Sequence, residues 1–398
     1  MKILFACQYY APGVSGVSRV VQEYSENLFK LGHDVSVATS KLNFLEQEVL
    51  NGVKINRFDI SGNFVVGIKG EIQKYLTFIN NNEFDIIVIY AAQQWSFDCL
   101  IPVIKEIKSK LVHIPCGYSC LYNKKYSVYF KIMPDVLKEI DLLIFHASQY
   151  RDIEFAKAIG LSNYLILSNG ASDGEFEKCP IEDIRAKLKV AETDFIFLTV
   201  GSPPTLKGHK DLLKSYDCLD VNFPTTLILN GNYDTGLSFK NFLKYLLQMS
   251  DRQTIRLAKK ISKKNNKKVL ITNLKREEVI SLFFKANLFV LSSHVEYSPL
   301  VLFEATASGL PFLSLSVGNS DEISKWTKGG EVIYVKKDKF GNAIVDHMEL
   351  AIKMRDLALD ADKRKLYAHN GRESWGKKYK WSIICQKLEK ILQKTCLI

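Results

Sequence analysis

The sequence has 398 residues, of which 47% are hydrophobic and 24% are charged. These proportions exclude a disordered or low-complexity chain, and the length predicts two domains at roughly 100–200 residues each. The formal net charge of +11 favours anionic partners such as phosphorylated substrates or an anionic membrane surface. Lysines spread evenly over the surface explain the charge equally well, and we predict no nucleic-acid partner.

The cysteines and the apolar runs limit the cellular setting. None of the eight cysteines has C-x-x-C spacing, so neither a zinc ribbon nor a thiol redox site is predicted. The N-terminal apolar run, Ile3–Cys7, is shorter than the core of a signal peptide, and the run Ile86–Ala92 is too short to span a bilayer. We therefore expect a cytoplasmic protein, and peripheral contact with the inner face of the cell membrane stays compatible with this interpretation.

The first half of the chain alternates short strands with helices. A strand at Lys2–Ala6 leads into a glycine-containing loop at 11–16 and an amphipathic helix that ends at Gly32. Further strands are predicted at Asp34–Thr39, Val53–Phe58, Asp85–Tyr90, Leu111–Ile114, Leu142–His146 and Tyr164–Leu167, and further helices at Lys69–Asn80, Ile101–Lys108 and Gln149–Ile159. This alternation predicts a parallel, doubly wound α/β sheet.

The same pattern starts again after a turn cluster at 169–174 and a charged helix at Ile181–Leu188. The expected elements are the strand Phe195–Val200, the loop 201–208, the helix Lys210–Leu219, the strands Thr226–Asn230, Val269–Ile271, Leu288–Leu291 and Pro311–Leu315, and a last helix at Trp375–Leu392. We therefore predict one Rossmann-like domain over residues 1–175 and a second over 190–374. The C-terminal helix, 375–398, can pack back on the first domain.

The segment that follows the strand Leu288–Leu291 predicts a ligand-binding helix start. Ser298 fits the N-cap position, Pro299 fits the first helical position, and Gly309 fits the end of the helix. Free N–H groups and the positive end of the helix dipole favour a phosphate at such a helix start. The segment predicted to bind the phosphate is Ser298, Pro299, Leu300 and Val301.

Two carboxylates flank this helix start. Glu296 lies in the loop before the helix, and Glu304 lies within its otherwise apolar sequence. A buried carboxylate needs a partner, and the 2′,3′-diol of a ribose is a suitable one. A Glu304 that faces solvent or caps a neighbouring loop fits the helix pattern equally well.

Five segments in order resemble those of one enzyme family. Residues 296–311, Glu-Tyr-Ser-Pro-Leu-Val-Leu-Phe-Glu-Ala-Thr-Ala-Ser-Gly-Leu-Pro, resemble the E-x7-E motif of family-4 retaining glycosyltransferases with the GT-B fold. The other four are Tyr10–Gly16, Leu31–Val35, Ser168–Gly170 and Val317–Glu322, which resemble the N-terminal glycine loop, the G-H-x-V step, the interdomain N-G and the glycine-rich turn of that family. The set spans nearly the whole chain and implies two Rossmann-like domains facing each other across a cleft.

The resemblance also implies a role for individual residues. By position in the motif, Glu304 would hold the ribose and Glu296 would contact hydroxyls of the donor sugar. Lys207, in the loop that also contains Gly201 and Ser202, matches the family lysine that neutralises the departing diphosphate. The implied reaction is a retaining transfer from a UDP- or GDP-sugar to a glycan or lipid-linked acceptor, as in polysaccharide or lipopolysaccharide assembly, without a cofactor or a metal.

The N-terminal domain is the implied acceptor domain. The acceptor-side candidates are Gly13, Ser15, Cys116, Gly117 and Tyr118, and backbone amides near Ser15 and Gly16 are expected to help hold the donor's phosphates.

Two positions depart from the family pattern. Ser202 stands where the family usually has arginine, and Cys116 stands where it usually has histidine. His113 is expected to be structural, whereas His294 fits a residue of the cleft and a packing residue of the loop equally well.

Three other interpretations follow from these departures and from the fold class. A catalytically impaired nucleotide-sugar-binding protein of the same fold would explain Ser202 and Cys116. A Rossmann oxidoreductase is disfavoured because Gly13 and Gly16 do not form G-x-G-x-x-G. An epimerase or phosphorylase on the same fold is the weakest alternative. The sequence does not identify the donor sugar or the acceptor.

Overall fold

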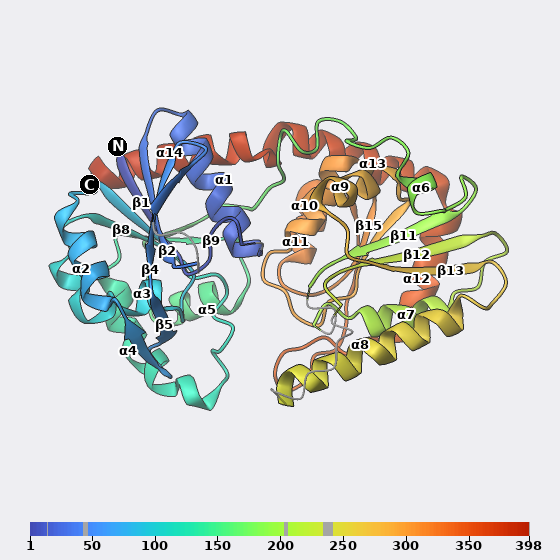
Figure 1. Ribbon diagram of the computed structural model, residues 1–398, viewed down its shortest axis with the longest axis horizontal. Helices are drawn as coiled ribbons and strands as arrows, with labels where there is room; N and C mark the ends of the chain where they lie inside the picture. The colour runs from blue at the N-terminus through green and yellow to red at the C-terminus, as the bar shows by residue number, and fades with distance from the viewer. Residues whose placement is uncertain (14, 43–46, 203–205, 234–241, 398) are drawn as a thin grey trace. The chain divides into compact units, whose positions relative to one another are not determined.

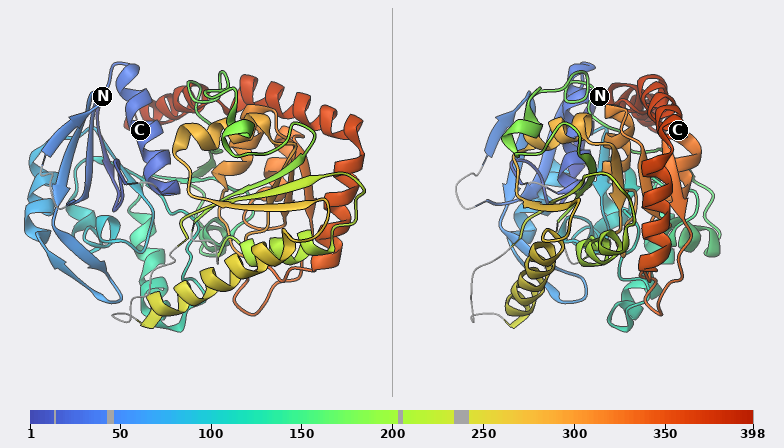
Figure 2. Two further views of the ribbon diagram at one scale, coloured as in Figure 1. Left: turned by 45° about the vertical axis from the view of Figure 1, so that its right-hand side comes forward. Right: turned by 90° about the vertical axis from the view of Figure 1, so that its right-hand side faces the viewer.

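The computed structural model describes residues 1–13, 15–42, 47–202, 206–233 and 242–397, with the backbone alone for residue 47 and residues 242–250. The chain forms two compact units, which Figures 1 and 2 show as ribbons. Unit 1 contains Met1–Asn169 together with Trp381–Ile398, and unit 2 contains Gly170–Lys380. The chain therefore passes from one unit to the other twice.

The sheet of unit 1 has eight strands in the order β10-β9-β8-β7-β1-β2-β4-β3. Its strands are β1 (Lys2–Ala6), β2 (Asp34–Ser40), β3 (Gln47–Leu50), β4 (Val53–Phe58), β7 (Ile86–Tyr90), β8 (Lys110–Ile114), β9 (Leu142–Phe145) and β10 (Tyr164–Ile166). Neighbouring strands are parallel, except that the edge strand β3 is antiparallel to β4. This confirms the predicted doubly wound sheet, and β3 is an addition that the sequence analysis did not predict.

The helices of unit 1 differ from the prediction at several places, and two of them, Trp95–Asp98 and Ser127–Lys138, were not predicted. They are α1 (Gly16–Lys30), α2 (Ile72–Asn81), α3 (Trp95–Asp98), α4 (Ser127–Lys138), α5 (Arg151–Ala158) and α14 (Trp381–Leu397). The predicted helix Lys69–Asn80 starts late because residues before it pair in a hairpin of β5 (Ile60–Asn63) and β6 (Gly67–Gly70). The predicted helix Ile101–Lys108 is a short 3₁₀-helix, Ile101–Glu106, with proline in its first turn.

The last helix of the chain is part of unit 1. The predicted single helix Trp375–Leu392 is divided into a π-helical turn, Trp375–Tyr379, and α14, because Lys380 has an extended backbone. Lys380 instead forms a parallel bridge with Ala171. Beyond it α14 packs on α1, where the ring centroids of Trp381 and Tyr24 are 5.5 Å apart.

The sheet of unit 2 has six parallel strands in the order β13-β12-β11-β14-β15-β16. Its strands are β11 (Phe195–Val200), β12 (Thr225–Asn230), β13 (Lys267–Thr272), β14 (Leu288–Leu291), β15 (Phe312–Leu315) and β16 (Gly330–Ile333). The first strand, β11, lies in the middle, and the strand order changes direction between β11 and β14. This is the order of a Rossmann fold, in which ligands bind at the carboxyl ends of the strands where the direction changes.

The helices of unit 2 cover both faces of its sheet. They are α6 (Ile184–Lys187), α7 (His209–Cys218), α8 (Phe242–Ile261), α9 (Arg276–Lys285), α10 (Leu300–Ser308), α11 (Ser320–Thr327), α12 (His347–Leu359) and α13 (Ala361–Ser374). Figures 1 and 2 show α7 and α8 on one face, and α9, α10 and α13 on the other. The charged helix predicted at Ile181–Leu188 is present as the shorter α6. Among the helices that the structure describes, none is long and apolar enough to cross a bilayer.

Candidate active site

Two loops of unit 2 meet where the strand order changes direction. The loop after β11 contains Gly201, Ser202 and Lys207, and the loop after β14 leads into α10. Ser202 is exposed to solvent. The predicted loop residues Pro203, Pro204 and Thr205 lie outside the described part of the chain.

A glycine allows these two loops to approach closely. Gly208 has a φ of 67°, and a Cβ atom there would overlap the carbonyl oxygen of Ser292. The Oγ of Ser292 donates to the carbonyl of Gly208 over 3.2 Å, and the N–H of His294 donates to the carbonyl of Leu206 over 3.0 Å. Only a residue without a side chain fits at position 208.

The loops bring Lys207 and Glu296 into direct contact. The Nζ of Lys207 lies 2.5 Å from Oε1 of Glu296, and the side chains are 26% and 10% exposed respectively. The family resemblance predicts Lys207 at the leaving phosphate and Glu296 at the donor sugar. The two groups lie together and neutralise each other at the site where this fold binds its ligands.

The glycine-rich turn before α11 supports the backbone of Glu296. A Cβ atom at Gly318, where φ is 56°, would overlap the carbonyl oxygen of Tyr297. The N–H of Asn319 donates to the same carbonyl oxygen over 2.9 Å. The segment 317–322, singled out by the resemblance, therefore packs directly on the loop that carries Glu296.

The start of α10 differs from the prediction by one residue. The helix begins at Leu300, and its N-cap is Pro299 rather than Ser298. Pro299 has an extended ψ of 111°, and its carbonyl accepts the N–H of Leu302, so it stands outside the helix. The prediction of Ser298 as the N-cap was wrong, and so was that of Pro299 as the first helical residue. The end of the helix at Gly309, where φ is 74°, is confirmed.

Glu304 contacts an arginine that the sequence analysis did not single out. Arg276 is the first residue of α9, after the carboxyl end of β13, and its Nη2 lies 2.6 Å from Oε1 of Glu304. The same Nη2 lies 2.8 Å from Oε2 of Glu175, while the Nε of Arg276 donates to Oε1 of Glu175 over 3.3 Å. Burial lowers the pKa of Arg276, but Glu304 and Glu175 outweigh burial, so its pKa rises above the usual range.

Asp211 holds two histidines beside the loops. Asp211 is on α7. Its Oδ2 lies 2.8 Å from Nε2 of His294, and its Oδ1 lies 2.9 Å from Nε2 of His347. The hydrogen bond with His294 and the one with His347 outweigh burial and hold the pKa of Asp211 well below its usual range. These contacts support the interpretation of His294 as a residue that fixes its loop.

Replacing Asp211 by asparagine should lower the free energy of unfolding by about 1–3 kcal/mol at pH 7. Because the folded state depresses the pKa of Asp211, this stability is present above the unfolded pKa and is lost as the pH falls through the folded pKa. The difference between the two proteins should therefore narrow below about pH 4. Denaturant titrations from pH 3 to pH 8 measure it, with Asp220→Asn, at an exposed position, as the control. A difference independent of pH would contradict this account.

The glycine loop of unit 1 is held by hydrogen bonds at the N-cap of α1. The N–H of Ser15 donates to Oγ of Ser18 over 2.8 Å, and Oγ of Ser15 accepts the N–H of Ser18 over 3.1 Å. The N–H of Ser15 is therefore used within the helix cap. Gly16 is the first residue of α1, and a Cβ atom at Gly16 would meet only open space. Gly13 donates its N–H to the carbonyl of Tyr10 over 3.1 Å. Val14 of this predicted loop is outside the described residues.

Cys116, Gly117 and Tyr118 form a left-handed turn after β8. Their φ angles are 60°, 94° and 45°, a conformation that is costly for the two residues other than glycine. The N–H of Gly117 donates to Oδ2 of Asp152 over 2.8 Å. Burial, with a smaller contribution from the charge of Asp152, raises the pKa of Cys116 to about 12, so its thiol stays protonated at neutral pH.

His113 has the environment of a structural histidine. It is fully buried on β8, its ring centroid lies 4.2 Å from that of Phe97, and its Nδ1 lies 3.1 Å from the carbonyl oxygen of Ile89. Burial lowers the pKa of His113 to about 4, so it is neutral at physiological pH. These observations support the structural role expected for it.

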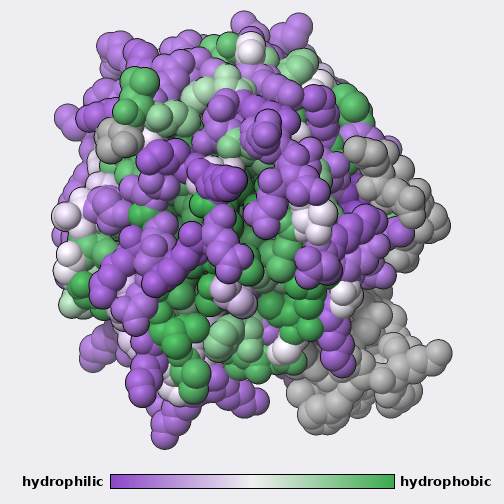
Figure 3. Space-filling view, turned by 90° about the vertical axis from the view of Figure 1, so that its left-hand side faces the viewer, coloured by the Kyte–Doolittle hydropathy of each residue, from purple (hydrophilic) through white to green (hydrophobic). Residues whose placement is uncertain are grey.

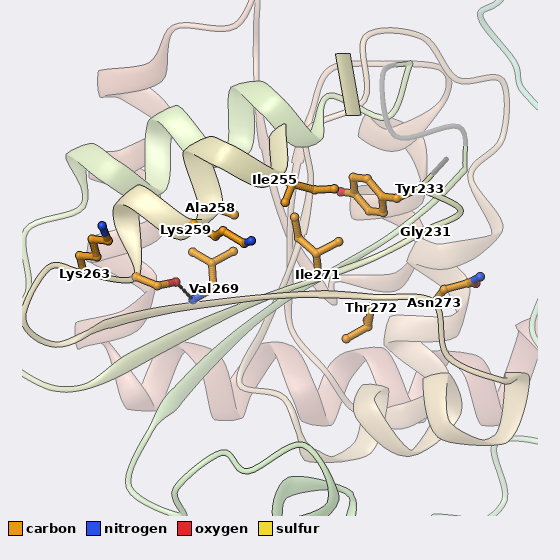
Figure 4. Close-up of a pocket in the computed structure, with 11 residues that line it drawn as sticks. Gly231, Tyr233, Ile255, Ala258, Lys259, Lys263, Val269, Ile271, Thr272 and Asn273 are labelled. Carbon is orange, nitrogen blue, oxygen red and sulfur yellow. Dashed lines mark hydrogen bonds between the residues drawn. The ribbon is translucent and has the colours of Figure 1, made fainter. Parts of the chain in front are cut away.

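A cavity of about 740 Å³ lies between α8 and β13. Figure 4 shows its wall of apolar side chains from both elements, including Ile255, Val269 and Ile271. Gly231 in its lining lies close to the loop after β11, because a Cβ atom there would overlap the carbonyl oxygen of Gly201. Its lining does not include Lys207, Glu296 or Glu304, so the cavity and the predicted site are separate features.

Comparison with solved structures gives the fold of the chain. A sucrose-phosphate synthase from Thermosynechococcus elongatus superposes with a TM-score of 0.78 over 99% of this chain and 98% of its own, at 16% identity. The Anabaena protein Alr3699/HepE, solved in complex with UDP and glucose, superposes with a TM-score of 0.71 over 99% of this chain and 100% of its own, at 14% identity. The two similarities identify the fold as GT-B.

Comparison of sequences shows which family the second half of the chain is similar to. Residues 180–373 match the model of the glycosyl transferases group 1 family. The uncharacterized glycosyltransferase MJ1607 from Methanocaldococcus jannaschii is 21% identical, with 97% of this chain and 96% of the relative aligned. Residues 180–373 therefore form a group 1 glycosyltransferase domain, the chain has the GT-B fold, and the comparisons support a glycosyltransferase, an enzyme of the EC 2.4 class.

Proposed function

We propose that this enzyme transfers a sugar, with retention of anomeric configuration, from a UDP- or GDP-sugar to a glycan or lipid-linked acceptor. The observation that carries the proposal is the contact between Lys207 and Glu296 at the point where the strand order changes direction. The similar Anabaena protein was solved with UDP and glucose, which supports a nucleotide-sugar donor.

The proposed donor site uses the two loops and the start of α10. The diphosphate would lie at the backbone N–H groups of Leu300 and Val301, which as the first residues of a helix have no intrahelical acceptor. Lys207 would then turn from Glu296 to the β-phosphate, and Glu296 would accept hydrogen bonds from the sugar hydroxyls. Ser202 supplies no positive charge, so Lys207 carries this role without the usual arginine.

The proposed reaction breaks the bond between the anomeric carbon and the β-phosphate oxygen. The departing phosphate accepts the proton of the acceptor hydroxyl, whose oxygen bonds to the anomeric carbon on the same face. Catalysis then consists of positioning the reactants and stabilising the negative charge of the leaving group. Lys207 is the catalytic cation, and Glu296 touches the reacting sugar.

We assign the donor to the domain 190–374 and the acceptor to the domain 1–175. The acceptor-side candidates Gly13, Ser15 and Gly117 lie after β1 and β8, at the carboxyl edge of the unit 1 sheet. Cys116 and Tyr118 complete the left-handed turn at that edge, and such turns store strain that often serves binding. This placement supports the acceptor assignment.

A basic segment of unit 1 supports an acceptor at an anionic membrane surface, as in cell-surface polysaccharide or lipopolysaccharide assembly. Residues 107–134 contain five lysines and neither aspartate nor glutamate. Tyr122 and Val128 in this segment are each 62% exposed. Figure 3 shows apolar and hydrophilic side chains together on the side where unit 1 lies. Exposed apolar groups beside cations suit the interface of an anionic bilayer. We propose that this contact is with the cytoplasmic face of the membrane.

We expect the protein to bind vesicles that contain anionic lipid at low salt and to dissociate as salt is raised. The triple replacement of Lys124, Lys125 and Lys131 by glutamate should abolish co-sedimentation. The matched control replaces Lys353, Lys365 and Lys390, which are on α12, α13 and α14, in the same way. Equal binding by both triple variants would show that this segment is not the contact.

Screening of nucleotide sugars tests the donor assignment. A ligand at 100 times its Kd should stabilise the protein by about 2.7 kcal/mol, which a thermal scan detects. UDP- or GDP-sugars should raise the Tm, NAD should not, and the turnover product should keep the donor's anomeric configuration by NMR. Stabilisation by NAD alone would favour an oxidoreductase, and stabilisation without turnover over a range of acceptors would favour the impaired binding protein.

A further inference from the structure

Arg276 links Glu304 to a second carboxylate in unit 2. Its guanidinium faces Glu175 with both Nε and Nη2, and it faces Glu304 with Nη2. The guanidinium carbon also lies 5.8 Å from the ring centroid of the buried Phe176. Two carboxylates and an aromatic ring therefore restrict the orientation of one guanidinium.

We propose that Arg276 is a positioning residue that fixes the Glu304 carboxylate for the two ribose hydroxyls of the donor nucleotide. This inference rests on the proposed function, in which Glu304 holds the ribose. Arg276 contacts Oε1 of Glu304, and Oε2 keeps its lone pairs for hydroxyl donors.

The surroundings of Glu304 explain why it needs such a residue. Its side chain is 10% exposed, and its neighbours on α10 include the fully buried Leu302, Phe303 and Ala305. An ionised carboxylate in these surroundings is costly unless it is paired. Arg276 supplies the charge and, because Glu175 orients its planar fork, it also supplies a fixed direction.

The pairing with Glu175 also sets the charge of the group. One guanidinium faces two carboxylates, so the three side chains together carry a net charge of −1 when all are ionised. The negative charge that is left over favours neutral hydroxyl donors, such as a diol, over a phosphate at this point. A lysine at position 276 would keep the charge but lose the bidentate contact with Glu175.

The test compares ribonucleotides with their deoxy analogues. Calorimetry measures the Kd of UDP, 2′,3′-dideoxy-UDP, GDP and 2′,3′-dideoxy-GDP. Each Kd is measured for the wild-type protein, for Arg276→Ala and for Arg276→Lys. Wild type should bind the better ribonucleotide about 10- to 100-fold more tightly than its dideoxy form, because hydrogen bonds to a charged acceptor are lost. Both variants should bring this ratio to within about threefold, chiefly by weakening ribonucleotide binding.

The matched control is Lys275→Ala, which removes one positive charge from the adjacent, exposed position and leaves Arg276 in place. It should keep the wild-type ratio. A merely structural role of Arg276 would weaken ribo- and dideoxynucleotide binding equally, and an unchanged ratio in both variants would overturn the proposal. Arg276→Lys keeps the experiment decisive if Arg276→Ala does not fold.

The wild-type measurement separates this inference from the proposed function. If wild type binds neither UDP nor GDP, or does not distinguish them from their dideoxy forms, the ribose assignment of Glu304 fails and the role of Arg276 fails with it. If wild type distinguishes them and the two variants do so equally well, Arg276 alone loses its role.

Discussion

Replacing Lys207 by alanine should lower kcat/KM for transfer from the donor by about 100- to 1000-fold. Loss of a single group that stabilises the charge of a leaving group has an effect of this size. The effect should be large because Ser202 offers no second cation in the same loop. Steady-state kinetics with the donor identified by thermal screening provides the measurement.

Lys210→Ala is the matched control for Lys207. Lys210 is on α7, two residues past Gly208, and its Nζ donates to Oε1 of the exposed Gln253 over 3.0 Å. Its loss should change kcat/KM by less than about twofold, as expected for a substitution outside the site. Lys207→Arg should recover part of the activity because it restores the charge, and equal activity of Lys207→Ala and wild type would remove Lys207 from the mechanism.

Replacing Glu296 by glutamine should lower kcat by about 100-fold and change the Kd of the free nucleotide by less than about threefold. The reason is that Glu296 is proposed to contact the sugar, whose orientation matters most in the transition state. Glutamine keeps the size of the side chain but breaks the ion pair with Lys207. Kinetics and calorimetry on the same preparation separate the two effects.

Glu277→Gln is the control for Glu296, because Glu277 is an exposed carboxylate in the first turn of α9. Glu277→Gln should leave both kcat and the Kd of the free nucleotide unchanged. Glu304→Gln should show the opposite pattern to Glu296→Gln, with a weakened Kd for the nucleotide. Full activity of Glu296→Ala would show that the assignment of this carboxylate is wrong.

The strands that surround the site were predictable because each is a continuous apolar run. Both strands whose loops meet at the site, Phe195–Val200 and Leu288–Leu291, have the predicted bounds. A parallel strand covered by helices on both faces must be apolar throughout, and turn residues mark its ends. The position of Lys207 and Glu296 on neighbouring loops follows from this strand order.

The residues that contact the predicted site residues were harder to predict from the sequence. Arg276 is 28 positions from Glu304, and Glu175 is 101 positions from Arg276, so no local pattern joins them. The predicted strand Val269–Ile271 ends one residue before β13 does, so Arg276 also follows the carboxyl end of the predicted strand. A charged residue just past such an end is a signal that could have identified it.

The prediction at Ser298 failed for a local reason. Serine before proline at a helix start usually caps the helix, but here the proline itself is the extended residue whose carbonyl accepts the first N–H. Helix ends are decided by single hydrogen bonds, and the sequence pattern does not choose between adjacent positions. The division of the last helix at Lys380 likewise depends on a bridge to Ala171, which is more than 200 residues earlier.

The return of α14 to unit 1 has a consequence for how the polypeptide can be dissected. Because residues 381–398 pack with Met1–Asn169, unit 1 is discontinuous in sequence, and a fragment ending at Asn169 would lack the indole that covers Tyr24. One proteolytic nick between the units would leave both halves tethered through the other crossing. Unit 2, by contrast, is a single uninterrupted stretch, Gly170–Lys380, and can be excised whole.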